Sequence, residues 1–255
     1  MLRQSILIAV FCTLAISWPV AQSRPELIGA AKEITARDQV EEWLTYYYQH
    51  PRPDLLVSAL RFMSKDGWLQ KSDAQAPLVA FLSRVFIANP DRLKGWAADV
   101  ANDSEDEKVT VATALWMVDG DKSQEVLGAI TRDGPATFQV KVKSLQANRP
   151  PDLLKDEINS PQFLDALWGA FFATGNERYV QRLISALPML DAEGDVMKML
   201  IGGAAQWSLT SNAVQHPKVM EICEAELRIL PEDQKPELTK IIKSAREKSA
   251  HEERK

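Results

Sequence analysis

The sequence predicts an all-α protein built from stacked antiparallel helical hairpins. Two observations indicate this fold class. Apolar residues recur at spacings of three and four along most of the chain, and proline and glycine stand where helices begin and end. Because no short period is fixed, we expect an irregular α-solenoid-like or layered helical array rather than a regular superhelix.

Five stretches carry the helical spacing most fully. Residues at i, i+3, i+4 and i+7 share one face of a helix, so each stretch has an apolar stripe that must pack against another element. The stretches are 78–86, 109–117, 164–172, 180–187 and 238–245. We therefore expect helices that are held together along these stripes.

Proline and glycine supply the expected boundaries. Proline is tolerated in the first turn of a helix and glycine is favoured just after the last one. The prolines at or near starts are Pro53, Pro77, Pro90, Pro161, Pro217 and Pro231, and the glycines after ends are Gly67, Gly120, Gly134 and Gly175. Short connections between short helices favour consecutive hairpins.

One short segment has the alternation of a strand. Phe138, Val140 and Val142 are apolar at every second position. A strand needs a partner, and no second alternating run is present. A helical or irregular conformation is therefore predicted here.

A weak internal repetition runs through the chain. Each of three similar tetrapeptides, at 57–60, 127–130 and 184–187, follows a segment that carries a tryptophan. The residue pairs that lie 127 positions apart are Leu60 with Leu187, Gly67 with Gly194, and Pro90 with Pro217. Either these are diverged repeats of a helical stack, or a chain rich in leucine and alanine produces them by chance.

The N-terminal residues have the layout of a secretory signal peptide. Arg3 precedes an apolar run over 5–20, and Ala21 and Ser23 are small residues placed for cleavage after Ser23. We expect residues 1–23 to be removed and the protein to be periplasmic or secreted. The run is short for a membrane span, which needs about 20 apolar residues, and the mature chain is expected to have no span.

The expected mature part, 24–255, is one all-helical domain. Diverged halves would cover about 38–103 and 160–230, and a C-terminal capping helix would cover about 231–250. The charged composition of this last stretch indicates an amphipathic helix whose end frays.

Composition and motifs exclude several function classes. Thirty-five acidic residues against 30 basic ones, without a basic stripe, argue against nucleic-acid binding. Three histidines and a single mature cysteine, Cys223, offer no clustered zinc ligands, so neither a metal nor a cofactor is predicted. The nucleophile elbow, the phosphate loop and the zinc-protease motif are absent, which favours a binding role over an enzymatic one.

The candidate binding residues are three tyrosines and two histidines. Tyr46, Tyr47 and Tyr48 are consecutive, so they cannot all face inward, and an exposed tyrosine is favoured in recognition surfaces. Packing at the edge of the core is the alternative. His50 and His216 both follow glutamine and precede proline, where they would serve as ligands or a general base, or simply finish a helix.

Two further clusters have alternative interpretations. The acidic residues Asp103, Glu105, Asp106 and Glu107 would bind a hard cation or favour the start of the next helix. Met189, Met197, Met199 and Leu200 would line an adaptable pocket or fill the core.

Segments 74–92, 164–178 and 205–217 resemble a group of exported bacterial proteins without an assigned function. In general shape the chain is similar to helical-repeat scaffolds of the tetratricopeptide or HEAT kind, although the Trp-Leu-Gly-Tyr pattern of the former is absent. The resemblance implies a helical fold and carries no catalytic residues.

The leading functional hypothesis is an exported scaffold that binds a protein or peptide partner. The alternative is a hydrolase that acts on cell-wall or extracellular polymers with a pair of carboxylates. A carrier of an apolar ligand is a third hypothesis.

Overall fold

A computed structural model describes residues 26–252 of the chain. The expected signal peptide, 1–23, lies outside these residues. Within them the regular secondary structure is helical and no strand is present, so the predicted all-α fold is confirmed. None of the described helices combines the length and the apolar character that crossing a membrane requires.

The helices are short and closely spaced. The α-helices are α1 (Glu26–Gly29), α2 (Arg37–Tyr46), α3 (Leu56–Lys65), α4 (Ser72–Ala88), α5 (Leu93–Val100), α6 (Glu105–Val118), α7 (Asp121–Asp133), α8 (Ala136–Gln146), α9 (Pro161–Thr174), α10 (Glu177–Ile184), α11 (Val196–Gln215), α12 (Pro217–Ile229) and α13 (Lys235–Glu252). Short 3₁₀ helices are η1 (Pro53–Leu55), η2 (Pro90–Arg92), η3 (Leu187–Asp191) and η4 (Glu232–Gln234).

The described chain divides into two compact units. The first unit ends at Leu183 and the second begins at Ile184. Each unit has its own apolar core, and each is described by itself below.

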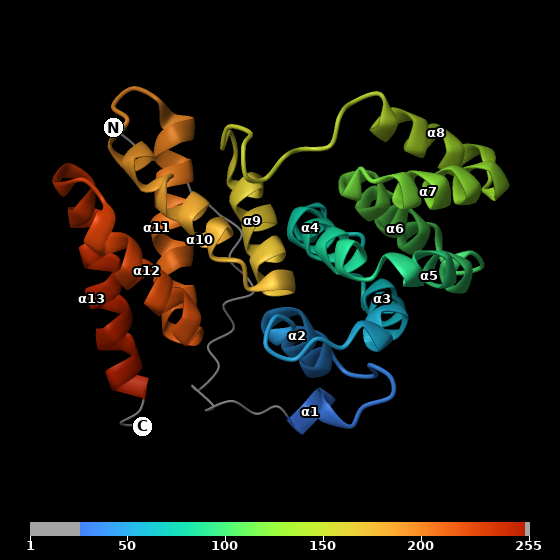
Figure 1. The fold of residues 1–255 in the computed structure, drawn as a ribbon, viewed down its shortest axis with the longest axis horizontal. Helices are drawn as coiled ribbons and strands as arrows, with labels where there is room; N and C mark the ends of the chain where they lie inside the picture. The colour runs from blue at the N-terminus through green and yellow to red at the C-terminus, as the bar shows by residue number, and fades with distance from the viewer. Residues whose placement is uncertain (1–25, 253–255) are drawn as a thin grey trace, which may run out of the picture. The chain divides into compact units, whose positions relative to one another are not determined.

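In the first unit, α4 is the central helix. It packs along α9 on one side and α6 on the other (Figure 1). Phe81, Phe86 and Phe171 are among its largest fully buried side chains. Burying an aromatic or large aliphatic side chain contributes about 1.5–3 kcal/mol, so this three-helix contact dominates the stability of the unit.

The contact between α4 and α9 is close because a glycine lies at the crossing. A β-carbon added to Gly169 would lie 2.0 Å from the carbonyl oxygen of Pro77. Any larger residue at position 169 would force the two backbones apart. Gly169 therefore sets the distance between the two helices.

The structure places Pro77 inside a helix rather than at its start. Helix α4 begins at Ser72, five residues before the proline. Proline has no N–H, so the carbonyl group of Asp73 lacks the donor that residue i+4 usually provides. The apolar spacing begins only at Leu78, which is why it indicates a helix that is too short at its N-terminal end.

The segment with alternating residues is helical, as predicted. It forms α8, in which Phe138 and Val142 are buried and Val140 is exposed. Residues i and i+4 share one face of a helix, so the two buried side chains belong to the same stripe.

In the second unit, α11 packs against η3, α12 and α13. A glycine again permits a close contact, since a β-carbon on Gly202 would lie 2.2 Å from the backbone nitrogen of Leu190. Ile201, Leu209 and Ile241 are buried in the core of this unit. Helix α13 covers most of the stretch in which the sequence indicates a capping helix.

Candidate functional site

The predicted tyrosine run lies at the end of α2, and its middle residue is buried. The ring of Tyr47 makes edge contacts with Trp43 and Phe81, with ring centroids 5.6 Å and 5.2 Å apart. Burial raises the pKa of the Tyr47 hydroxyl to about 12. Tyr47 therefore serves the core of the first unit.

The neighbouring tyrosines are partly exposed. The Tyr48 ring lies 5.2 Å from the ring of Phe171, and its backbone N–H donates to the carbonyl oxygen of Phe172 at 2.9 Å. Tyr48 thus contacts α9 and links the end of α2 to it. Among the candidate residues in this part of the chain, His50 is exposed, and Tyr46 and Tyr48 are half-buried.

His216 occupies a different environment. It is the last residue before α12 begins at Pro217, and its side chain is fully buried in the second unit. Burial lowers the pKa of its imidazole to about 3, because the charged form would lose its hydration. His50 and His216 share a sequence context but belong to different units and differ in exposure.

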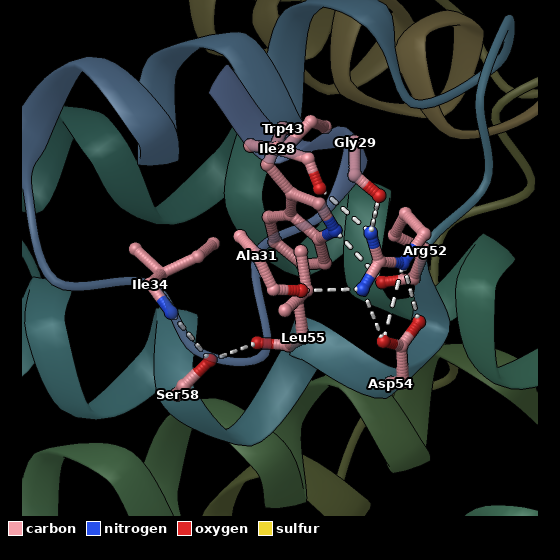
Figure 2. A network of polar contacts seen from close by, with 9 residues as sticks. All are labelled: Ile28, Gly29, Ala31, Ile34, Trp43, Arg52, Asp54, Leu55 and Ser58. Atoms are coloured by element: carbon pink, nitrogen blue, oxygen red, sulfur yellow. Dashed lines mark hydrogen bonds and ion pairs between the residues drawn. The ribbon is translucent and has the colours of Figure 1, made fainter. Parts of the chain in front are cut away.

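A network around Arg52 follows the tyrosine run (Figure 2). The guanidinium donates to the carbonyl oxygens of Ile28 at 2.6 Å, Gly29 at 3.0 Å and Ala31 at 2.7 Å. It also binds the Asp54 carboxylate at 2.6 Å. The hydrogen-bonded ion pair raises the pKa of Arg52 and lowers that of Asp54.

This network closes the C-terminal end of α1. The last carbonyl groups of a helix have no partner within the helix, and a cation there is favourable. A second link is formed by Ser58, whose Oγ accepts from the backbone N–H of Ile34 at 3.0 Å and donates to the carbonyl oxygen of Leu55 at 2.9 Å (Figure 2). Trp43 Nε1 donates to the carbonyl oxygen of Arg52 at 2.9 Å. We call this network of Arg52, Asp54, Ser58 and Trp43 the clasp, because it links the segment before α2 to the residues that follow α2.

A groove of about 490 Å³ lies beside this clasp, between residues 33–35 and α3. Phe62 contributes apolar surface, and Lys65 and Glu33 contribute opposite charges. The groove therefore has both apolar and charged walls.

Two carboxyl groups meet at the contact between α4 and α9. Asp73 and Asp165 each lie one turn before the crossing of Pro77 and Gly169. Burial raises the pKa of Asp165 to about 6, and the negative charge of Asp73 adds to the increase. The Oδ1 atom of Asp73 is buried and accepts no hydrogen bond.

The acidic run at the start of α6 takes part in capping and in links to α3. Ser104 Oγ accepts from the backbone N–H of Glu107 at 3.3 Å, as an N-cap residue does. Asp103 binds the Arg61 guanidinium at 2.8 Å. Burial raises the pKa of Glu107, which favours its protonated form. Among the described residues no three His, Cys, Asp or Glu side chains are grouped to hold a metal ion.

The feature that sequence reasoning missed is an exposed apolar face on α11. Val196, Met199 and Trp207 are 70%, 45% and 43% exposed. Met197 is exposed as well, so two members of the methionine cluster lie on the surface. The signal was present in the sequence, because the 20 residues of α11 contain a single charge, Lys198.

The face of α11 opposite to these exposed residues packs in the core of the second unit. Ile201, Ala205 and Leu209 are buried there. A helix buried along one face usually carries charged residues on the other, and α11 does not. The face opposite the core therefore carries the apolar residues Val196, Met199 and Trp207 together with the neutral polar residues Thr210 and Ser211.

Comparison with known proteins finds no relative: no family model, curated protein or solved structure matches this chain.

Proposed function

We propose that this protein is an exported helical scaffold that binds a protein partner through the exposed face of α11. The observation that carries the proposal is the exposure of Val196, Met199 and Trp207 along one helix whose single charged residue is Lys198. Apolar surface left in water is unfavourable, and covering it contributes about 25 cal/mol per Å². Tryptophan and methionine are enriched in protein interfaces, and tryptophan often contributes most to the binding energy.

Export is the part of the proposal that the N-terminal sequence supports. Arg3, the apolar run over 5–20 and the small residues Ala21 and Ser23 form the pattern of a cleaved leader. We expect the protein purified from its native source to begin at Arg24 and to occur in the periplasmic or culture fraction. Intact mass measurement tests this, and a protein that retains residues 1–23 would contradict it.

Partner binding is tested by site-specific photo-crosslinking in intact cells. A benzoylphenylalanine at Met199 should form an adduct with a partner, and Trp207→Glu in the same chain should abolish the adduct because a charge replaces the anchor. The matched control is the same probe at Ile229, which is 74% exposed on α12. Equal adducts from both positions, or none from Met199, would contradict the proposal.

A second candidate, a hydrolase of cell-wall or extracellular polymers, is favoured by the carboxyl pair. Glycosidases use two carboxyl groups whose pKa values differ, and the pKa of Asp165 is raised to about 6 next to Asp73. If the pair is catalytic, Asp73→Asn and Asp165→Asn should each abolish release of fragments from purified cell wall. Asp91→Asn is a surface control. A wild-type protein that releases no fragments would exclude this function.

A further inference from the structure

Helix α11 matches α4 at a constant separation of 127 residues. The two helices end at Ala88 and Gln215, and a proline follows each at the same distance, Pro90 and Pro217. Gly67 and Gly194, also 127 residues apart, precede the helices and have left-handed φ values of 77° and 84°. A glycine with a left-handed φ therefore precedes each helix, and a proline follows each one.

On one side, α4 and α11 also pack against helices at corresponding positions in the chain. Helix α4 packs against α6, and α11 packs against α13, which begins three residues after the position that matches the start of α6. The buried residues correspond in the same way. Leu78, Phe81 and Leu82 in α4 match Ala205, Ser208 and Leu209 in α11, and all six are buried.

The other side differs between the two helices. In the first unit, α9 covers α4, with Gly169 against Pro77. One turn further on, Ala80 of α4 is fully buried, whereas its counterpart Trp207 is 43% exposed. Helix α11 therefore exposes the face that α9 covers on α4.

We propose that this face of α11 is a docking surface for one α-helix of a partner protein that resembles α9. This inference rests on the proposed function and specifies its partner. Charge supports it, because α9 carries one charged residue, Asp165, and α11 carries one, Lys198. A partner helix with no charge on its contact face can dock on Val196, Met199 and Trp207 without removing a charge from water.

Residue size supports the same occupant. Ala204 in α11 is the counterpart of Pro77 in α4, and Gly203 precedes Ala204 in the chain. A β-carbon on Gly203 would meet only the tip of Leu190, at 3.9 Å. Small residues at the centre allow close approach of a second helix, and Trp207 flanks them as an anchor. Leu200 takes the place of Asp73, so the partner should present an apolar residue where α9 has Asp165.

The probe is a labelled synthetic peptide of residues 160–176 with two added lysines at each end for solubility and with Asp165→Ala. Its binding to the full mature chain is measured by fluorescence anisotropy. We expect saturable binding, at least tenfold tighter than that of the peptide with Asp165, which would place a charge against Leu200. A peptide that also carries Gly169→Leu should bind at least tenfold more weakly, because it cannot approach as closely.

Protein variants locate the site. Ala204→Glu and Trp207→Ser should each weaken peptide binding at least tenfold, while Ile229→Glu should leave it unchanged. Circular dichroism confirms folding, and Trp207→Ser changes an exposed side chain that the core does not need. Absent binding, or binding that both variants leave unchanged, overturns the inference.

Two other occupants of the face are tested in parallel. A wild-type chain that dimerises in sedimentation, with Ala204→Glu monomeric, would show that a second copy occupies the face. Binding to phosphatidylglycerol vesicles that requires Trp207 and that the peptide does not compete would show a membrane surface. Either result overturns the inference. If the peptide fails while the Met199 crosslink persists, the inference falls and the proposed function stands.

Discussion

At Gly169 the backbones of two helices approach so closely that one hydrogen atom is all the space allows. The position of Asp165, four residues earlier on the same helix, follows from this approach, because it brings the carboxyl group towards Asp73. Single residues thus decide both how close the central helices lie and how costly a charge between them is.

Gly169→Ala should destabilise the first unit. The added carbon would lie 2.0 Å from the Pro77 oxygen, which is backbone and cannot rotate away. Overpacking of this kind costs about 1–3 kcal/mol, and urea unfolding followed by tryptophan fluorescence measures it. Gly128→Ala in α7 is the control, because nothing lies within 4 Å of its added carbon. It should stabilise by about 0.5–1 kcal/mol, and equal effects of the two substitutions would contradict the close contact.

Asp165 should make the first unit more stable in acid. Its folded pKa of about 6 exceeds the ordinary value of 3.8, so the folded state binds the proton more tightly. The contribution is fully present below pH 3.8 and is lost as the pH rises through 6. Asp165→Asn should raise the free energy of unfolding at pH 7 by on the order of 2 kcal/mol and remove this pH dependence. A variant that keeps the wild-type dependence would refute the assignment.

Among the elements, α1 depends on one side chain from outside it. It has only four residues, too few for a stable helix in isolation, and the Arg52 guanidinium binds the carbonyl groups at its end. The clasp is thus the means by which the segment before α2 is held against the first unit.

Arg52→Gln should therefore release this segment. Limited proteolysis should cut between residues 26 and 36 several-fold faster in the variant, with cleavage sites read by mass spectrometry, while the remainder of the unit stays intact. Lys94→Gln is the control, because the ion pair of Lys94 with Glu125 is exposed on both sides and should contribute little. Unchanged cleavage in Arg52→Gln would show that other contacts hold α1.

The sequence predicted the elements whose apolar stripes are long. Helices α6, α9 and α13 all cover stretches with the full spacing. It also predicted that Phe138 and Val142 belong to a helix or an irregular segment rather than a strand, because a lone strand has no partner, and the structure shows the helix. The sequence pattern placed the start of α4 too late. Residues Ser72 to Ala76 include no large apolar residue, and no glycine or proline stands directly before Ser72.

The candidate sites were less accessible to sequence reasoning. The burial of Tyr47 depends on where α4 packs, because its ring contacts Phe81, and spacing within α2 cannot reveal this. The exposed face of α11 was missed for a related reason. A helix with almost no charged residue is usually buried, and only the structure shows that Val196, Met199 and Trp207 of α11 are exposed.

At the scale of the whole molecule, each unit contains one buried group, and the two groups should change stability with pH in opposite directions. The first contains Asp165, whose pKa is raised, and the second contains His216, whose pKa is lowered to about 3. The contribution of His216 is fully present above its ordinary pKa of 6.5 and is lost as the pH falls towards 3. Acid should therefore stabilise the first unit through Asp165 and destabilise the second unit through His216.

Hydrogen exchange measured by mass spectrometry tests this difference. Between pH 6.5 and 4, protection corrected for intrinsic rates should decrease in peptides from α12 and increase or hold in peptides from α4. In His216→Asn the loss of protection in α12 should no longer depend on pH in this range. Parallel changes in both units of the wild-type protein would contradict the prediction.

The burial of Cys223 matters for the proposed export of the protein. Its side chain is fully enclosed, and burial raises the pKa of the thiol to about 12, so the reactive thiolate is suppressed. In an oxidising compartment the sulfur is therefore protected from mixed disulfides for as long as α12 stays in place. The rate at which a small reagent alkylates the thiol should therefore report how often the second unit opens.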